Sequence, residues 1–532
     1  MTVTPTRTRT AARGSTALRR FRPWYPSPYL LVGGLAWLAL TLASWRVPMC
    51  CDFGQHAAVV ERLRESLLHP RHPLADLPGE GSPYYSPYAL AQGLFARLTG
   101  LNGIATVRLA TPFHLAVLLT GLGRLVRALT PRPWAPVWAL AAVTLLWGTE
   151  RAWWSGFLNL VSMTGNLGYP SALALGLTLW AWALTADRAL TADRVRAADG
   201  RGARPVRFVG PGGLPGLPGH AALGVLYGLV LLIHPVTFVA AALGAVAFAA
   251  APGRPRPALL ARWALTAATA LAVTLAWPYC DVLALAGDTG LDVMHRQLYD
   301  RLPQRCWLAV VLGLPALCVR ARRAGRPWRD PLVLLFALDC AALAYGWFSG
   351  RWTYARLLGP ALLPLQLALA VELAAPRPWS RRRRALGVAA AAGAACALLT
   401  VHAAALVPSD RFGRLPHWPS YDWAARHIGR GEPVLADGYF APRLLPGHGA
   451  DLVAPPWPDP LLGEAERGRR LAATARYLDP ATGRAGREAI ARRYRVRWLL
   501  LTRWKRTPEE AVVVAWSRET GEVLARVGRA GP

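Results

Sequence analysis

The sequence predicts an α-helical polytopic membrane protein with about 11 transmembrane helices, followed by a C-terminal α/β domain on the outer face. Three observations predict this fold class. Of the 532 residues, 53% are hydrophobic and only 17% are charged, whereas about a quarter of the residues are charged in soluble proteins. The apolar residues lie in windows long enough to cross a bilayer. Arginines gather in every second loop between these windows, as expected for loops that stay in the cytoplasm.

Residues 1–28 form a basic tail that we expect to remain in the cytoplasm, because positive charge near a span resists translocation. We interpret the first span as a retained anchor and not as a cleaved signal peptide. The region after Trp45 lacks a small-x-small cleavage site, and further spans follow. The transmembrane domain covers 29–407, with a large first outer loop at 46–101. Spans are predicted at 29–47, 102–123, 134–148, 168–184, 221–233, 236–251, 263–279, 304–319, 330–348, 357–374 and 385–407.

The arginine pattern also predicts the orientation of the chain. Basic loops follow the second, fourth, sixth, eighth and tenth spans. This alternation requires His234 and Pro235 to form a turn between two short helices, because a single span over 221–251 would invert every later loop. An odd number of spans then places the C-terminus outside. Since the arginine bias is typical of a GC-rich bacterial genome, we expect a bacterial plasma membrane.

Residues 408–532 differ in composition from the rest and predict a separate extracytoplasmic α/β domain. About 125 residues can support a core of their own. Helices are predicted at 421–428, 463–477 and 484–494, and strands at 433–437, 496–501, 511–516 and 522–527. A basic cluster lies at the end of the last helix and is either solvated or in contact with an anionic envelope polymer. It consists of Arg492, Arg493, Arg495 and Arg497.

The first outer loop carries the first candidate catalytic residues. Asp52 follows the first span directly, and His56 lies one helical turn later on the same face. A carboxylate at a membrane edge is costly unless it is paired or used. The structural alternative is that Asp52 caps the following helix and His56 only packs. Further along the loop, Tyr84, Tyr85 and Tyr88 either anchor the membrane interface or shape a pocket for a sugar or a lipid headgroup.

An Asp-x-x-x-His pattern just beyond the first span, followed by the Pro-Tyr-Tyr-x-Pro-Tyr segment 83–88, resembles the GT-C superfamily of membrane glycosyltransferases. The protein O-mannosyltransferase and aminoarabinose transferase families are the nearest comparisons. The resemblance implies transfer of a sugar from a polyprenyl-phosphate donor to an acceptor on the outer face, with Asp52 as the essential acid. The sequence lacks the Asp-Asp, Asp-Glu or Asp-x-Asp pair of these families, which leaves open the second acid and the use of a divalent cation.

Such a reaction needs a base for the acceptor hydroxyl and positive charge for the leaving phosphate. Asp52 is the candidate base. Arg351 and Arg356, with Tyr354 between them, lie in an outer loop where arginine is disfavoured, and their guanidinium groups match phosphate oxygens. They could instead bind ordinary lipid phosphates or loop carbonyls.

Two further outer-face residues are secondary candidates. Glu150 is a candidate second acid, or pairs with the adjacent Arg151, and His234 is a candidate substrate-binding residue, or packs at its turn. The expected partners are the lipid-linked donor, membrane lipids and an envelope glycan, lipid or protein as acceptor. The positive charge, +31 overall, is explained by cytoplasmic span ends, so no nucleic-acid partner is expected.

Soluble-nucleotide chemistry has no support, since the sequence contains no Gly-x-x-x-x-Gly-Lys loop and no His-Glu-x-x-His or Gly-x-Ser-x-Gly motif. Two alternatives to the glycosyltransferase stay open. One is a polytopic transporter or lipid flippase, which would carry charged residues inside its spans. The other is a noncatalytic membrane scaffold whose outer domain binds envelope components.

Overall fold

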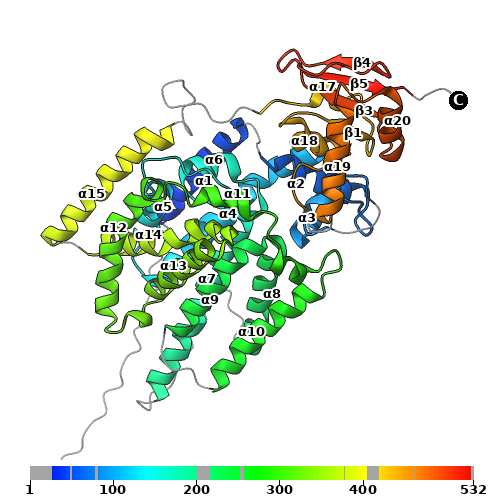
Figure 1. Cartoon of the computed structure of the whole chain (residues 1–532). Coiled ribbons are helices and arrows are strands. Elements are labelled where there is room, and N and C mark those ends of the chain that lie inside the picture. Colours follow the sequence, from blue (N-terminus) through cyan, green and yellow to red (C-terminus); the bar gives the residue numbers. More distant parts are fainter. Residues whose placement is uncertain are drawn as a thin grey trace, which may run out of the picture.

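The computed structural model describes residues 27–47, 51–77, 82–199, 216–251, 257–376, 378–403, 418–459 and 462–528, without the side chains of 190–199 and 286. The predicted basic tail therefore lies almost wholly outside the described residues. Within them, a bundle of long helices is joined to a small sheet domain, and two helices of the first outer loop lie between these parts (Figure 1).

A helix forms at each of the eleven predicted spans. Their bounds are α1 Pro28–Arg46, α4 Gly103–Leu129, α5 Ala135–Leu145, α7 Pro170–Asp199, α8 Leu217–Ile233, α9 Pro235–Ala250, α10 Pro257–Leu275, α12 Leu302–Arg323, α13 Pro331–Ser349, α14 Leu358–Leu373 and α15 Arg381–Ala397. Seven segments among the described residues are long and apolar enough to cross a membrane, while α5, α8 and α9 are shorter apolar helices. The chain is thus a polytopic membrane protein, and the count of eleven crossings stays a prediction.

The chain reverses direction at His234, between two short helices as predicted. Gly224 on α8 lies against Thr266 on α10, and Gly228 against Ala270. These contacts advance together along both helices, so α8 and α10 run in the same direction. The helix between them, α9, must therefore run back. The reversal is possible because His234 is extended and accepts a hydrogen bond from the backbone of Thr237, while proline begins α9.

The loops predicted to be cytoplasmic lie at one end of the helical bundle, and those predicted to be outside lie at the other end. At one end, acidic residues pair with arginines of loops expected in the cytoplasm: Arg124 with Asp187, Arg320 with Asp330 at 2.7 Å, and Arg323 and Arg383 with Glu372 at 2.9 and 2.7 Å. The segments expected outside meet at the other end, beside α2 (Phe53–Glu65) and α3 (Pro87–Thr99), where the Trp277 ring N–H donates to the Tyr85 carbonyl at 2.8 Å and the Tyr279 hydroxyl to the Leu67 carbonyl at 2.5 Å. This segregation agrees with the predicted alternation, and which end faces the cytosol stays a prediction.

The C-terminal domain contains a five-stranded sheet in the order β2-β1-β3-β5-β4. The strands are β1 Pro433–Ala436, β2 Asp451–Leu452, β3 Trp498–Leu501, β4 Ala511–Trp516 and β5 Val523–Val527. β1 runs parallel to β2 and β3, whereas β5 is antiparallel to β3 and β4. Helices α19 (Glu464–Tyr477) and α20 (Arg484–Arg493) supply apolar side chains to a core that includes Leu435 and Leu499. The short strand β2 was not predicted.

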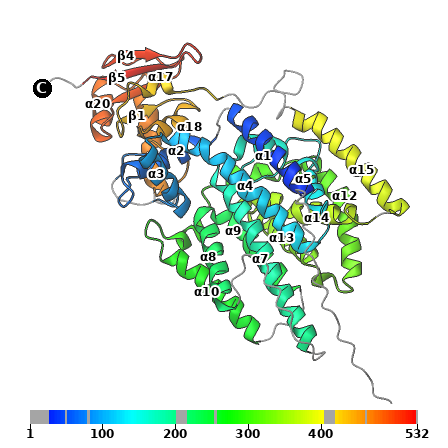
Figure 2. The same cartoon turned by 180° about the vertical axis from the view of Figure 1, so that it is seen from behind.

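The first outer loop is fastened to this sheet domain, and Figure 2 shows α2 and α3 beside it from behind. The backbone N–H of Leu452 donates to the carbonyl of Leu74 at 2.8 Å, so the loop extends the sheet beyond β2. A side chain at Gly54 would collide with the carbonyl oxygen of Arg443, only 2.0 Å from the position of a Cβ. The sheet domain therefore packs directly against the helix that follows Asp52.

Candidate active site

Asp52 and His56 lie on one face of the first turn of α2, as the sequence predicted. His56 Nε2 is 3.6 Å from Asp52 Oδ2. The interpretation of Asp52 as a helix cap is wrong, because its side chain makes no capping hydrogen bond to α2. The Asp52 side chain keeps 43% of its surface exposed, whereas that of His56 keeps 15%. The carboxylate is therefore accessible and is not occupied by a capping hydrogen bond.

The surroundings of Asp52 favour its ionised form. Burial by itself would raise the pKa of the carboxyl, but the interaction with His56 and the charge of Arg356 outweigh it, and the pKa lies below its ordinary value. An ionised, accessible carboxylate can accept a proton from a hydroxyl group.

Arg356 contributes the cationic group of this site. It lies on the short helix η4 (Trp352–Leu357), and its Nη2 donates to the carbonyl and hydroxyl oxygens of Ser155 at 3.0 and 3.1 Å. The guanidinium carbon is 5.8 Å from the centre of the Trp154 ring. Among the described residues, Nη1 and Nε have no hydrogen-bond partner. Two nitrogens of a well-anchored guanidinium group are thus left for an anion.

Two histidines also lie near Arg356. His234 lies within electrostatic range of Arg356, His56, Asp52 and His295. Its Nδ1 accepts from the backbone of Thr237 at 3.1 Å, which also gives it the packing role considered from the sequence. Sequence reasoning missed His295, on α11 (Asp292–His295), although its loop follows the seventh predicted span and was expected on the outer side.

His295 is almost fully buried, and burial together with the charge of Arg356 lowers its pKa to about 3. Its Nδ1 lies 3.1 Å from the hydroxyl of Thr353, and its ring is 5.6 Å from that of Trp154. His295 is therefore a neutral imidazole at neutral pH, which can exchange hydrogen bonds without adding positive charge.

Of the three predicted tyrosines, only Tyr84 borders the Asp52–His56 pair. Its ring centre is 6.0 Å from that of His56, and Tyr169, which was not predicted, is 5.5 Å from it on an edge-to-face contact. Tyr85 is buried and donates its hydroxyl to the carbonyl of Arg71. The Tyr88 hydroxyl lies 2.5 Å from His114 Nε2. Tyr85 and Tyr88 are therefore engaged in holding the outer loop.

Three other predicted residues have partners away from the Asp52–His56 pair. Glu150 forms an ion pair with Arg301 at 2.8 Å, not with Arg151. Arg351 donates to the carbonyl oxygens of residues 287 and 288 at 3.4 and 3.2 Å, and its Nε lies 3.6 Å from Asp292. Tyr354 stacks edge-on against Tyr345 at 5.3 Å. Their assignment to catalysis or substrate binding stays a prediction.

The described residues contain no group of three or more His, Cys, Asp or Glu side chains that could hold a metal ion. Arg356 supplies positive charge within electrostatic range of Asp52, and the divalent cation considered from the sequence stays a prediction.

Comparison with solved structures identifies the fold. The archaeal oligosaccharyltransferase AglB from Archaeoglobus fulgidus, solved with an inhibitory peptide and a dolichol-phosphate, matches 95% of this chain and 74% of its own, with a TM-score of 0.50 at 12% identity. The arabinofuranosyltransferase AftD from Mycobacteria matches 94% of this chain, with a TM-score of 0.56 at 16% identity. Both are GT-C membrane glycosyltransferases. The chain has a GT-C-like fold.

The GT-C resemblance seen in the sequence is thereby confirmed at the level of the fold. This GT-C-like chain covers 40% of the length of AftD. No family model and no curated protein sequence matches it. At such low identity the likeness concerns only the arrangement of helices. The roles of individual residues are therefore inferred from the geometry of this chain.

Proposed function

We propose that this GT-C-like protein is a glycosyltransferase that moves a sugar from a polyprenyl-phosphate donor to an acceptor on the outer face of a bacterial plasma membrane. The observation that carries the proposal is the ionised, accessible Asp52 within electrostatic range of Arg356. The AglB structure, which contains a dolichol-phosphate, supports a lipid-phosphate donor. The acceptor is an envelope glycan, lipid or protein.

In the proposed reaction, Asp52 takes the proton of an acceptor hydroxyl while the hydroxyl oxygen forms a bond to the anomeric carbon. The bond between the anomeric carbon and the phosphate oxygen breaks, and its electron pair leaves with the lipid phosphate. Arg356 binds that phosphate through the two nitrogens that Ser155 does not occupy. His56 acts as a positioning residue, because its Nε2 lies 3.6 Å from Oδ2 of the Asp52 carboxylate.

The test replaces the proposed base, Asp52, and, as a control, another carboxylate of the same outer loop, Asp76. Full-length Asp52→Asn and Asp76→Asn variants are purified and supplied with radiolabelled undecaprenyl-phosphate mannose and decaprenyl-phosphate arabinofuranose, together with envelope extract. We expect transfer by the wild type with at least one donor, a loss of at least about a hundredfold for Asp52→Asn, and normal transfer by Asp76→Asn, whose carboxylate pairs with Arg495.

Normal transfer by a well-inserted Asp52→Asn variant would remove Asp52 as the base. Absence of transfer by the wild type with every donor would overturn the glycosyltransferase.

A transporter or lipid flippase is the second candidate, and one observation favours it. Asp339, on α13, is fully buried, and neither of its carboxylate oxygens has a hydrogen-bond partner among the described residues. Unpaired acids inside membrane helices commonly mark transport pathways. If the protein is a flippase, Asp339→Asn should stop the movement of a fluorescent polyprenyl phosphate across proteoliposomes, whereas a glycosyltransferase would retain transfer with that variant.

A further inference from the structure

The basic cluster predicted at the end of α20 does not act as a unit. Arg492 pairs with Glu488 at 3.8 Å, Arg493 lies over the ring of Tyr494, and Arg495 pairs with Asp76 of the outer loop. Arg497 has no ion pair within the part of the chain that the structure describes, and it is exposed. One member of the cluster is therefore left without an acidic partner.

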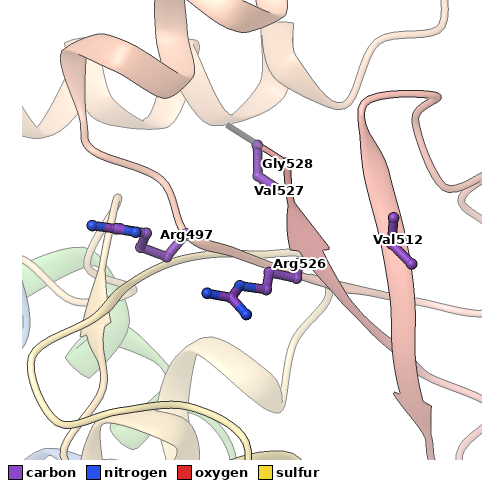
Figure 3. A pocket seen from close by; sticks show the side chains of 5 residues that line it. All are labelled: Arg497, Val512, Arg526, Val527 and Gly528. Atoms are coloured by element: carbon purple, nitrogen blue, oxygen red, sulfur yellow. The ribbon is translucent and has the colours of Figure 1, made fainter. Parts of the chain in front are cut away.

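Arg497 instead shares a hollow with a second unpaired arginine. The hollow has a volume of about 490 Å³ and is lined by Arg497, Val512, Arg526, Val527 and Gly528. Figure 3 shows the side chains of Arg497 and Arg526 extending to the same side, from the segment before β3 and from β5. The Val527 N–H donates to the Arg497 carbonyl at 3.0 Å, so the backbone holds the two arginines close together.

The two positive charges in this hollow are only partly balanced by the residues around it. Glu432 is near enough for both arginines to act on it, but its Oε2 already accepts from Trp498 Nε1 at 2.6 Å and from the Gly429 N–H at 2.8 Å. No carboxylate of the described residues lies within ion-pair distance of either guanidinium group. Two exposed guanidinium groups side by side form a site for a phosphate or carboxylate group.

The strand beside the hollow offers an extended surface for a larger molecule. β4 is the edge strand of the sheet, and its apolar side chains are uncovered from Val512, which is 68% exposed, to Trp516, which is 65% exposed. Exposed aromatic rings with an amphipathic character suit contacts with sugar rings. A polymer that carries anionic groups and sugar rings would therefore match both the arginine pair and the strand.

Lipid headgroups of the surrounding bilayer are a less suitable source of the anion. The strands β4 and β5 lie at the end of the sheet domain that is remote from α7, α10 and α12, which belong to the helical bundle (Figure 1). The hollow is also separate from Asp52, because α2, which begins directly after Asp52, lies on the side of the sheet domain that faces the helical bundle (Figure 1).

We infer that the hollow between Arg497 and Arg526, continued by β4, binds an anionic glycan polymer through its phosphate or carboxylate groups. This site is independent of sugar transfer at Asp52. It anchors the outer domain on a polymer of the envelope and does not take part in the chemistry.

The experiment measures binding of the full-length protein in nanodiscs to three polymers at physiological salt. A phosphomannan carries phosphate on sugar rings, polygalacturonate carries carboxylate on sugar rings, and dextran is neutral. We expect binding to one or both anionic polymers and none to dextran. The Arg497→Gln/Arg526→Gln variant should weaken this binding by at least about tenfold, since each charged hydrogen bond contributes substantially.

A charge-matched control separates the site from net charge. Arg484 and Arg492, both paired with Glu488 on α20, are replaced in an Arg484→Gln/Arg492→Gln variant, which should bind within about twofold of the wild type because surface charges act weakly at this salt concentration. Equal weakening by both double variants would overturn the inference, as would equal affinity for single-stranded DNA. Asp52→Asn should bind like the wild type, which distinguishes this site from the proposed transfer.

Discussion

The guanidinium group of Arg62 on α2 forms a buried ion pair with the carboxylate of Asp451 on β2, although 389 positions separate the two residues. Arg62 also donates to the carbonyl of Gly449 at 3.3 Å, and Arg71 lies 3.4 Å from the other oxygen of Asp451. The sheet domain therefore holds the helix that carries His56 and follows Asp52. A domain that was expected to fold separately contributes to the geometry of the candidate active site.

Asp451→Ala should destabilise the protein by about 3 kcal/mol, because it leaves the buried charge of Arg62 with only the longer ion pair to Glu65 at 3.6 Å. The change is measured as the free energy of unfolding of the purified protein in SDS titrations. Asp76→Ala is the matched control, because its ion pair with Arg495 also joins the outer loop to the sheet domain but is exposed. That variant should lose no more than about 1 kcal/mol. Equal losses would show that burial of the Arg62 pair has no special importance.

Gly54→Ala should disrupt the contact between α2 and the sheet domain. The added methyl group would meet the backbone carbonyl of Arg443, which cannot move independently of its helix, and we expect a loss of about 1 to 3 kcal/mol. Hydrogen exchange of residues 53–65 should increase in this variant. Gly468→Ala, on α19 with nothing within 4 Å of the new methyl group, should be neutral or stabilising. Unchanged exchange in Gly54→Ala would contradict the packing described.

His295 should make stability depend on pH. Its pKa is lowered to about 3 in the folded protein, so below the ordinary value of about 6.5 the unfolded chain binds a proton that the folded protein does not. Stability should therefore fall as the pH decreases from about 6.5 toward 3, by about 2 kcal/mol at pH 5 from this residue. SDS unfolding at pH 7 and pH 5 should show a smaller difference for His295→Gln than for the wild type. The exposed His427, changed to Gln, should follow the wild type.

Arg356 and Arg351 should differ in their effects on the donor. Arg356→Gln should raise the KM for the polyprenyl-phosphate donor by about tenfold or more, because two of its nitrogens are free for phosphate. Arg351→Gln should leave that KM nearly unchanged and cost about 1 to 2 kcal/mol of stability, since its hydrogen bonds hold the loop at 287–292. Steady-state kinetics and SDS unfolding of both variants test the difference. A larger rise in KM for Arg351→Gln would reverse the assignment.

Local composition was enough to predict the positions of the helices and the outline of the C-terminal domain. A membrane helix needs only a sufficiently long apolar segment, and the turn at His234–Pro235 followed from the arginines of the flanking loops. The adjacency of Asp52 and His56 was likewise predictable, because residues four positions apart are neighbours on one face of a helix. The short strand β2 carried no such signal, since two residues show no periodicity.

What the sequence determined by itself was therefore every feature that depends on neighbours along the chain: the apolar spans, the alternation of basic loops and the Asp52–His56 pair. Tertiary structure alone decided that Arg356 lies within electrostatic range of Asp52 while Arg351 pairs with Asp292. It also decided that Glu150 pairs with Arg301 and that His295 lies near Arg356. Arg351 and Arg356 are five residues apart and carry the same charge, so nothing local distinguishes them. Their partners come from distant segments, and only the packing of the helices determines which of those segments lies within hydrogen-bond distance.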